Sequence, residues 1–71
     1  KKEFEKCIIL YKNIILLEPN NITALNNIGY AFMQLKKYNK AIKFFERAIK
    51  IKSDFQLAIN NLKWAKSMLK E

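Results

Sequence analysis

The sequence has no histidine, and its 71 residues include one cysteine, one glycine and one proline. Without histidine, the chain offers no imidazole group for acid–base catalysis or for binding a metal ion. One cysteine cannot form an internal disulfide or a structural zinc site by itself, so a secreted disulfide scaffold is not indicated and a cytoplasmic location is favoured. A single glycine excludes a glycine-rich loop that binds phosphate.

Acidic residues are also few, and they are scattered along the chain. The six are Glu3, Glu5, Glu18, Glu46, Asp54 and Glu71. No two of them are three or four residues apart, so no helix face carries the paired carboxylates that acid–base catalysis would use. We therefore expect a protein that is not an enzyme and that uses no metal and no other cofactor.

Basic residues outnumber the acidic ones by 14 to 6, which gives a net charge of +8. This charge favours an acidic peptide, a nucleic acid or an anionic surface as partner, and a solvated coat of lysines is the simpler interpretation. Apolar runs are short, because Lys12 and Asn13 interrupt the most apolar part of the first helix that we expect. A membrane-spanning helix needs about 20 apolar residues, so none is predicted.

The strongest pattern is an internal repeat. The eight residues Ala24–Ala31 correspond to Ala58–Ala65, which lie 34 residues further along the chain. The same offset relates five upstream residues to later ones: Phe4 to Tyr38, Cys7 to Ala41, Tyr11 to Phe45, Ile14 to Ala48 and Pro19 to Ser53. A fixed period of this length indicates helical units stacked into an array.

One set of residues carries a family resemblance. Its members, in order, are Leu25, Ile28, Gly29, Phe32, Tyr38, Ala41, Phe45 and Ala48. Their order resembles the tetratricopeptide repeat, a helix-turn-helix unit with a period of about 34 residues. Pro19 stands at the proline that ends such a repeat, and Ser53 departs from it. The resemblance implies an all-α fold of antiparallel helix-turn-helix repeats, here four helices from a right-handed α-solenoid.

The repeat divides the expected single domain, residues 1–71, into three parts. Residues 1–21 are expected to be the second helix of a truncated repeat, residues 22–55 a full repeat, and residues 56–71 a C-terminal capping helix. Arrays generally need at least about three repeats, so we expect the chain to belong to a longer array or to be completed by another copy.

Helices are expected over residues 2–17, 22–35 and 38–51, and from residue 54 or 55 to 69. Pro19 ends the first helix, and Asn20 or Asn21 can cap the second. The family often has glycine where Lys36 stands, which suggests a left-handed backbone at that residue. Residues 53–56, Ser-Asp-Phe-Gln, have the form of a capping box for the fourth helix.

Two positions distinguish the fourth helix from the second. The only glycine, Gly29, is expected to let the third helix approach closely at Ala41, since glycine otherwise costs about 0.8–1 kcal/mol in a helix. Lys63 and Lys66 stand where Gly29 and Phe32 stand in the repeat. We therefore expect no helix to pack on that side of the fourth helix, which makes it a solvating cap. Alternatively, the lysine stems extend along a packed edge.

The resemblance also implies that the second and fourth helices line a concave groove. The candidate peptide-binding residues are Asn26, Asn27, Tyr30, Met33, Gln34, Asn60, Asn61 and Trp64. Thr23, Leu57 and Met68 are expected on the same side. Asparagine amides can bind the backbone of a peptide, whereas tyrosine, tryptophan and methionine supply contact area. The alternative is that the asparagines mark the fold and that Tyr30 and Trp64 pack within it.

Some family members clamp the C-terminal carboxylate of heat-shock chaperones. They use an asparagine like Asn27 together with basic residues on the neighbouring groove helices. Leu57 and Asn61 stand where the next helix would supply those basic residues, so the sequence does not favour this clamp. The leading prediction is a scaffold module that binds a segment of a protein partner.

Two other functions stay open. The first is self-association to a homo-oligomer through a face of the first helix that is expected to be exposed, formed by Phe4, Ile8, Tyr11 and Ile15. The second is nucleic-acid binding by lysines with Trp64 as a stacking surface. The lysines are spread around the helices rather than gathered in one stripe, so nucleic acid is not favoured.

Overall fold

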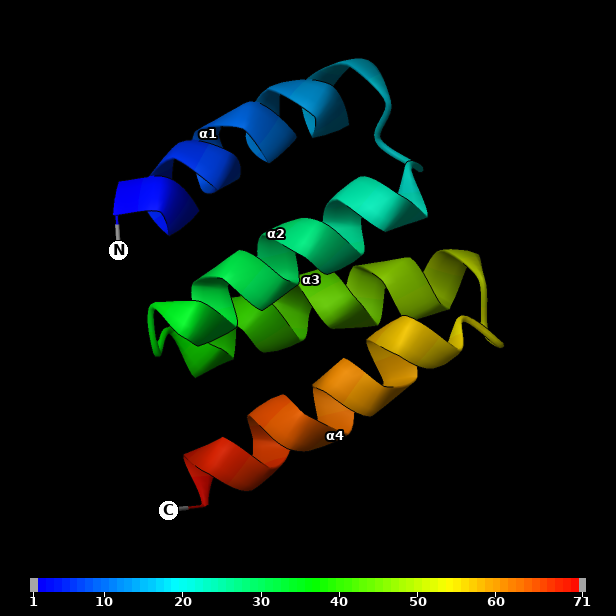
Figure 1. Cartoon of the computed structure of the whole chain (residues 1–71). Helices are drawn as coiled ribbons and strands as arrows, with labels where there is room; N and C mark the ends of the chain where they lie inside the picture. The colour runs from blue at the N-terminus through cyan, green and yellow to red at the C-terminus, as the bar shows by residue number, and fades with distance from the viewer. Residues whose placement is uncertain (1, 71) are drawn as a thin grey trace.

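A computed structural model of the chain describes residues 2–70. It contains four α-helices: α1 (Lys2–Leu17), α2 (Ile22–Gln34), α3 (Tyr38–Ile51) and α4 (Gln56–Leu69). Consecutive helices run in opposite directions (Figure 1) and are joined by short turns. The all-α fold of antiparallel helix-turn-helix units is thereby confirmed. Residues 1 and 71, which the expected domain includes, lie outside the described residues.

The helices form a thin slab whose Cα atoms extend over 35 × 31 × 14 Å. α2 packs against α1 and α3 and also touches α4, whereas within residues 2–70 α1 packs against α2 alone. The fully buried large side chains are Leu25 and Ile28 on α2 and Phe45 on α3. The core therefore follows the α2–α3 pair, which makes up the central repeat.

Gly29 marks the closest approach of α2 and α3. A Cβ atom added at Gly29 would lie 2.5 Å from Cε1 of Phe45, which is inside van der Waals contact. The sequence predicted the close approach correctly but assigned it to Ala41. The aromatic ring of Phe45 is the group that needs the space, because it is fully buried and lies directly over the glycine.

The turn between α2 and α3 has a left-handed residue, as the sequence suggested. Lys36 has a φ angle of 62°. The amide of Lys37 donates to the carbonyl of Phe32 at 2.8 Å, and the amide of Lys36 donates to the carbonyl of Met33 at 2.9 Å. These two bonds are those of a Schellman motif, which satisfies the last carbonyl groups of α2 and reverses the chain sharply.

The starts of α2 and α4 differ in how they are capped. Asn21 caps α2, because its side-chain oxygen accepts a hydrogen bond from the amide of Ala24 at 3.0 Å. The capping box predicted for α4 at residues 53–56 is wrong: α4 begins at Gln56, its N-cap is Phe55, and no side chain caps it. Phe55 instead packs on a buried cluster that includes Ala58, so apolar packing sets the start of this helix.

The exposure expected for one face of α1 is wrong. Ile8 is only 8% exposed, and the three other side chains assigned to self-association, Phe4, Tyr11 and Ile15, pack partly buried against the same core. They form the face that α2 covers. The exposed apolar side chains of α1 lie elsewhere on the helix: Ile9, Leu10, Leu16 and Leu17. No helix within residues 2–70 combines the length and the apolarity needed to cross a membrane.

The outer side of α4 is polar. Lys63 and Lys66 are exposed, whereas Gly29 and Phe32, which stand 34 residues before them, are buried. Among residues 2–70, the helices that α4 contacts are α3 and α2. Within the described residues, the two lysine side chains therefore lie in solvent.

Candidate peptide-binding groove

α2 and α4 are tied together by a pair of asparagines. The side-chain amide of Asn61 donates to the side-chain oxygen of Asn26 at 3.1 Å. Asn26 is only 7% exposed, so its expected availability to a peptide is wrong. A buried amide needs a partner, and this hydrogen bond supplies one while it fixes the distance between the two groove helices.

The other two asparagines of the predicted site have different surroundings. The amide of Asn27 donates to the hydroxyl of Tyr11 at 3.3 Å, which links α2 to α1. Asn60 is exposed, and its oxygen accepts a hydrogen bond from the side-chain amide of Gln56 at 2.9 Å. Asn60 is therefore the asparagine whose side chain is open to a ligand, whereas Asn27 supports the helix packing.

A pocket of about 170 Å³ lies where the C-terminal parts of α2 and α4 meet. It is lined by Met33, Gln34, Lys36, Tyr38, Trp64 and Met68. Met33 is 4% exposed and forms the floor, while Trp64 is 48% exposed and stands at the side. Three of the predicted peptide-binding residues, Met33, Gln34 and Trp64, are thus brought together by the fold.

Sequence reasoning missed Lys36 and Tyr38 as members of this pocket. Lys36 lies in the turn between α2 and α3, and Tyr38 is the first residue of α3. Neither residue therefore follows the spacing of the groove helices. The signal that could have found them is the left-handed turn. Because only three residues separate α2 from α3, the turn brings the first residue of α3 next to the last turn of α2.

Tyr30 and Asn27 line a different pocket. This second one, about 220 Å³ in volume, lies between α1 and α2. Its remaining lining residues are Phe4, Cys7, Tyr11 and Ala31. The two pockets therefore separate five of the predicted peptide-binding residues: Met33, Gln34 and Trp64 lie on the α4 side of α2, and Asn27 and Tyr30 on the α1 side.

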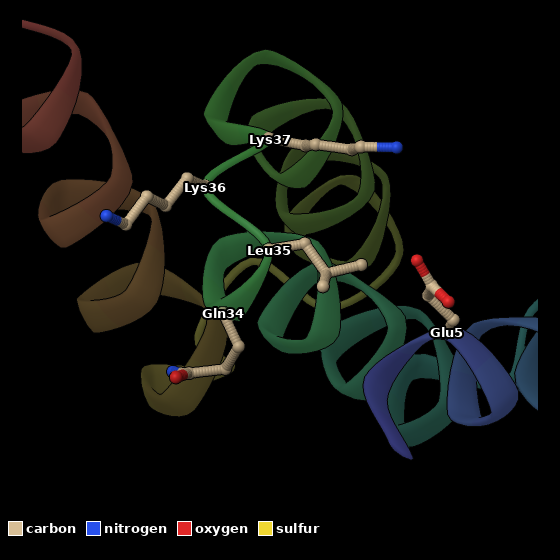
Figure 2. A pocket seen from close by; sticks show the side chains of 5 residues that line it. All are labelled: Glu5, Gln34, Leu35, Lys36 and Lys37. Atoms are coloured by element: carbon tan, nitrogen blue, oxygen red, sulfur yellow. The ribbon is translucent and has the colours of Figure 1, made fainter. Parts of the chain in front are cut away.

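A third pocket, of about 270 Å³, lies beside the α2–α3 turn and is drawn in Figure 2. Its lining residues are Glu5, Gln34, Leu35, Lys36 and Lys37. In Figure 2, Leu35 and Lys37 extend to the side where Glu5 lies, whereas Lys36 extends the opposite way, toward the ribbon of α4. The two lysines of the turn therefore diverge, and Lys36 is the one directed to the α2–α4 side.

The charge around the α2–α4 pocket is positive. Neither α2 nor α4 contains an acidic residue. The one ion pair found within residues 2–70 joins Lys52 and Asp54 at 3.5 Å, in the turn between α3 and α4 at the other end of the slab. A carboxylate that approaches the pocket would therefore meet Lys36 without an acidic competitor on either groove helix.

Comparison with known proteins supports the repeat. Residues 22–55 match the model of the tetratricopeptide repeat family. Stress-induced-phosphoprotein 1 of Caenorhabditis elegans is 33% identical over 61 residues, a match that covers 80% of this chain and 19% of that protein. Protein STIP1 homolog of Dictyostelium discoideum is also 33% identical over 61 residues, covering 80% of this chain and 11% of the relative. The chain thus spans less than a fifth of either relative's length.

Proposed function

Because residues 22–55 match the model of the tetratricopeptide repeat family, we propose that the chain is a non-catalytic module that binds a peptide segment of a partner protein in the groove between α2 and α4. The observation that carries the proposal is the pocket shared by the two helices, with Trp64 half exposed at its side and Met33 as its floor.

The size of the pocket favours a peptide over a small molecule. Pockets for small ligands usually have volumes of about 300–1,000 Å³. The α2–α4 pocket, at about 170 Å³, is smaller and holds one side chain. A ligand that binds here therefore needs further contacts along the groove, and an extended peptide provides them.

The polar residues of the groove suit the backbone of such a peptide. Asn60 and Gln34 have amide groups that both donate and accept hydrogen bonds, so they can pair with peptide amides whatever the side chains are. Trp64 supplies a rigid, amphipathic surface of the kind that carries much of the binding energy at interfaces. The asparagine pair Asn26–Asn61 holds the two helices at a fixed separation and so preorganises the groove.

A selection of short peptides from a random library, with this chain as the target, tests the proposal. Peptides that bind in the groove should lose at least about tenfold in affinity when Trp64 is changed to alanine, since central aromatic anchors typically account for about 2 kcal/mol or more. Leu16→Ala is the matched control, because Leu16 is an exposed apolar residue on α1. Equal binding to the two variants would remove the groove as the site.

Self-association through α1 is the second candidate, and the exposed apolar residues support it. Leu10 and Leu17 are 57% and 84% exposed, and they are seven residues apart, so they lie on one face of the helix. Ile9 and Leu16, at 63% and 79%, form a neighbouring stripe. Exposed apolar area of this kind often marks an interface. This assignment replaces the buried face that the sequence suggested.

Sedimentation equilibrium over a range of concentrations tests this candidate. The unchanged chain should increase in average mass with concentration, and a Leu10→Gln, Leu17→Gln variant should stay monomeric. Lys6→Gln, an exposed polar change on the same helix, is the control. A monomeric mass for the unchanged chain at every concentration would exclude self-association.

A further inference from the structure

We propose that the α2–α4 pocket binds a large apolar side chain with a carboxylate beside it, so that the partner segment is an acidic peptide with an aromatic or branched aliphatic anchor. The inference rests on the proposed function, because it specifies the chemistry of a peptide in the same groove. It is carried by a pocket whose lining combines four large apolar or aromatic side chains with Lys36, which is directed toward α4.

The apolar part of the pocket comes from three helices. Met33 on α2, Tyr38 at the start of α3, and Trp64 and Met68 on α4 supply the apolar lining. A cavity of about 150 Å³ lined by apolar side chains is large enough to bind benzene. The pocket has a similar volume, about 170 Å³, but it is open to solvent, so it has room for one aromatic or branched aliphatic side chain. Methionine side chains adapt their shape, so the pocket tolerates either.

The charged part is Lys36. Its side chain extends toward α4 (Figure 2), and it lines the α2–α4 pocket as well as the pocket beside the turn. The sequence has no acidic residue from position 19 to 45 or from 55 to 70, so neither groove helix can neutralise it. A carboxylate next to the anchoring side chain would gain this pairing, whereas a basic residue there would be repelled.

The distribution of the other lysines distinguishes a peptide from a nucleic acid. A nucleic-acid strand is followed by several basic groups along one groove, with aromatic side chains that stack on successive bases. Among the lysines of residues 2–70, Lys36 is the one that lines the α2–α4 pocket. Lys63 is adjacent to Trp64 in the helix and so points about 100° away from it, and Lys66 lies further round still. The groove thus offers one charge beside one apolar pocket, which fits a side chain and its neighbouring carboxylate.

The experiment starts from the same random peptide library, with this chain as the target. Selected peptides should be enriched in an aromatic or aliphatic residue that has aspartate or glutamate directly beside it. One selected peptide is then synthesised in two forms, with the carboxylate and with the corresponding amide. Their affinities for the unchanged chain, for Lys36→Gln and for Lys50→Gln are measured by calorimetry at low salt. Lys50, exposed on α3 near the opposite end, is the matched control for loss of one positive charge.

The expected result is that Lys36→Gln weakens the acidic peptide about twofold to fivefold, the range for an exposed ion pair, and has no effect on the amide form. Lys50→Gln should leave both affinities unchanged. If the selected peptides depend on Trp64 but lack acidic residues, or if the two lysine variants behave alike, the acidic partner is excluded and groove binding is retained. If no selected peptide depends on Trp64, the proposed function itself fails.

Discussion

α1 and α3 occupy the same place in the repeat, 34 residues apart, yet they are buried to different extents. Ala41, Phe45 and Ala48 of α3 are fully buried. The residues that correspond to them in α1 are Cys7, Tyr11 and Ile14, and all three are only partly buried. α3 is packed between α2 and α4, whereas within the described residues α1 packs against α2 alone.

The repeat pattern thus determines which face of a helix is apolar but not how deeply that face is buried. Burial depends on whether a neighbouring helix is present, because the units of a repeat array are stabilised by the interfaces between them. α1 therefore contributes less to the stability of this chain than α3, although the two helices carry a similar stripe.

The largest loss of stability is expected for a substitution in α3, and it tests the difference between α1 and α3 directly. Phe45→Ala removes a fully buried ring, which typically costs about 3–5 kcal/mol and leaves a cavity. Tyr11→Ala, at the corresponding position of α1, should cost about half as much or less, because the ring is already partly in solvent. Urea denaturation followed by circular dichroism measures both.

A domain of this size is only marginally stable, so Phe45→Ala is expected to be mostly unfolded in water, and the urea measurement then gives a lower limit for its loss of stability. Phe45→Leu, which retains most of the apolar volume, is the control that should stay folded with a smaller loss. Equal losses for Phe45→Ala and Tyr11→Ala would show that α1 is as well supported as α3.

A second pair of substitutions compares the stability contributions of corresponding positions in α2 and α4. Gly29→Ala places a Cβ 2.5 Å from the ring of Phe45, and such overpacking costs about 1–3 kcal/mol. The better helix propensity of alanine offsets roughly 0.8–1 kcal/mol, so the net result should be a loss of about 1 kcal/mol. Lys63→Ala at the corresponding position should change the stability by less than about 0.5 kcal/mol, as exposed sites do. A stabilised Gly29→Ala variant would mean that Phe45 moves aside freely.

Substitution of an asparagine in α4 is expected to cause a loss of stability of similar size. Asn61→Ala leaves the buried oxygen of Asn26 without its partner, which should cost about 1–3 kcal/mol. Asn60→Ala removes an exposed side chain and should stay within about 0.5 kcal/mol. Thermal melts of the two variants give the difference. A double change of Asn26 and Asn61 to alanine that costs no more than Asn61→Ala alone would confirm that the pair acts as a unit.

The smallest expected effect lies in the turns. Lys36 and Lys70 hold the same repeat position, but Lys36 has a φ angle of 62° and Lys70 has one of −75°. Lys36→Gly relieves a left-handed residue and should stabilise the chain by about 1 kcal/mol or less. Lys70→Gly should not stabilise it. The Lys36 variant should also bind the acidic peptide less well, so stability and affinity should change in opposite directions.

The sequence predicted the features that depend on the repeat period and on local rules. The ends of α1 and α3 follow from the spacing of apolar residues, and an asparagine cap for α2 follows from side-chain chemistry, although the choice of Asn21 over Asn20 came from the structure. The left-handed Lys36 was suggested by the family resemblance. Sequence reasoning failed where tertiary packing decides. Asn26 and Asn27 are alike in sequence, and only the rotation of α2 against α4 shows that Asn26 is the buried one. The capping box before α4 gave way to the packing of Phe55 for the same reason.

The contrast between Gly29 and Lys63 has a consequence for how copies of the chain can assemble. α4 and α1 correspond to the two halves of one repeat, so α4 of one copy and α1 of the next could complete a unit. Such an end-to-end contact builds a closed ring or an open filament, depending on the rotation between neighbouring copies. Where Gly29 admits the ring of Phe45, the corresponding site would bring Tyr11 of the next copy against Lys63. Because lysine has a long side chain where glycine has none, an aromatic ring of the next copy would find less room at Lys63 than Phe45 finds at Gly29.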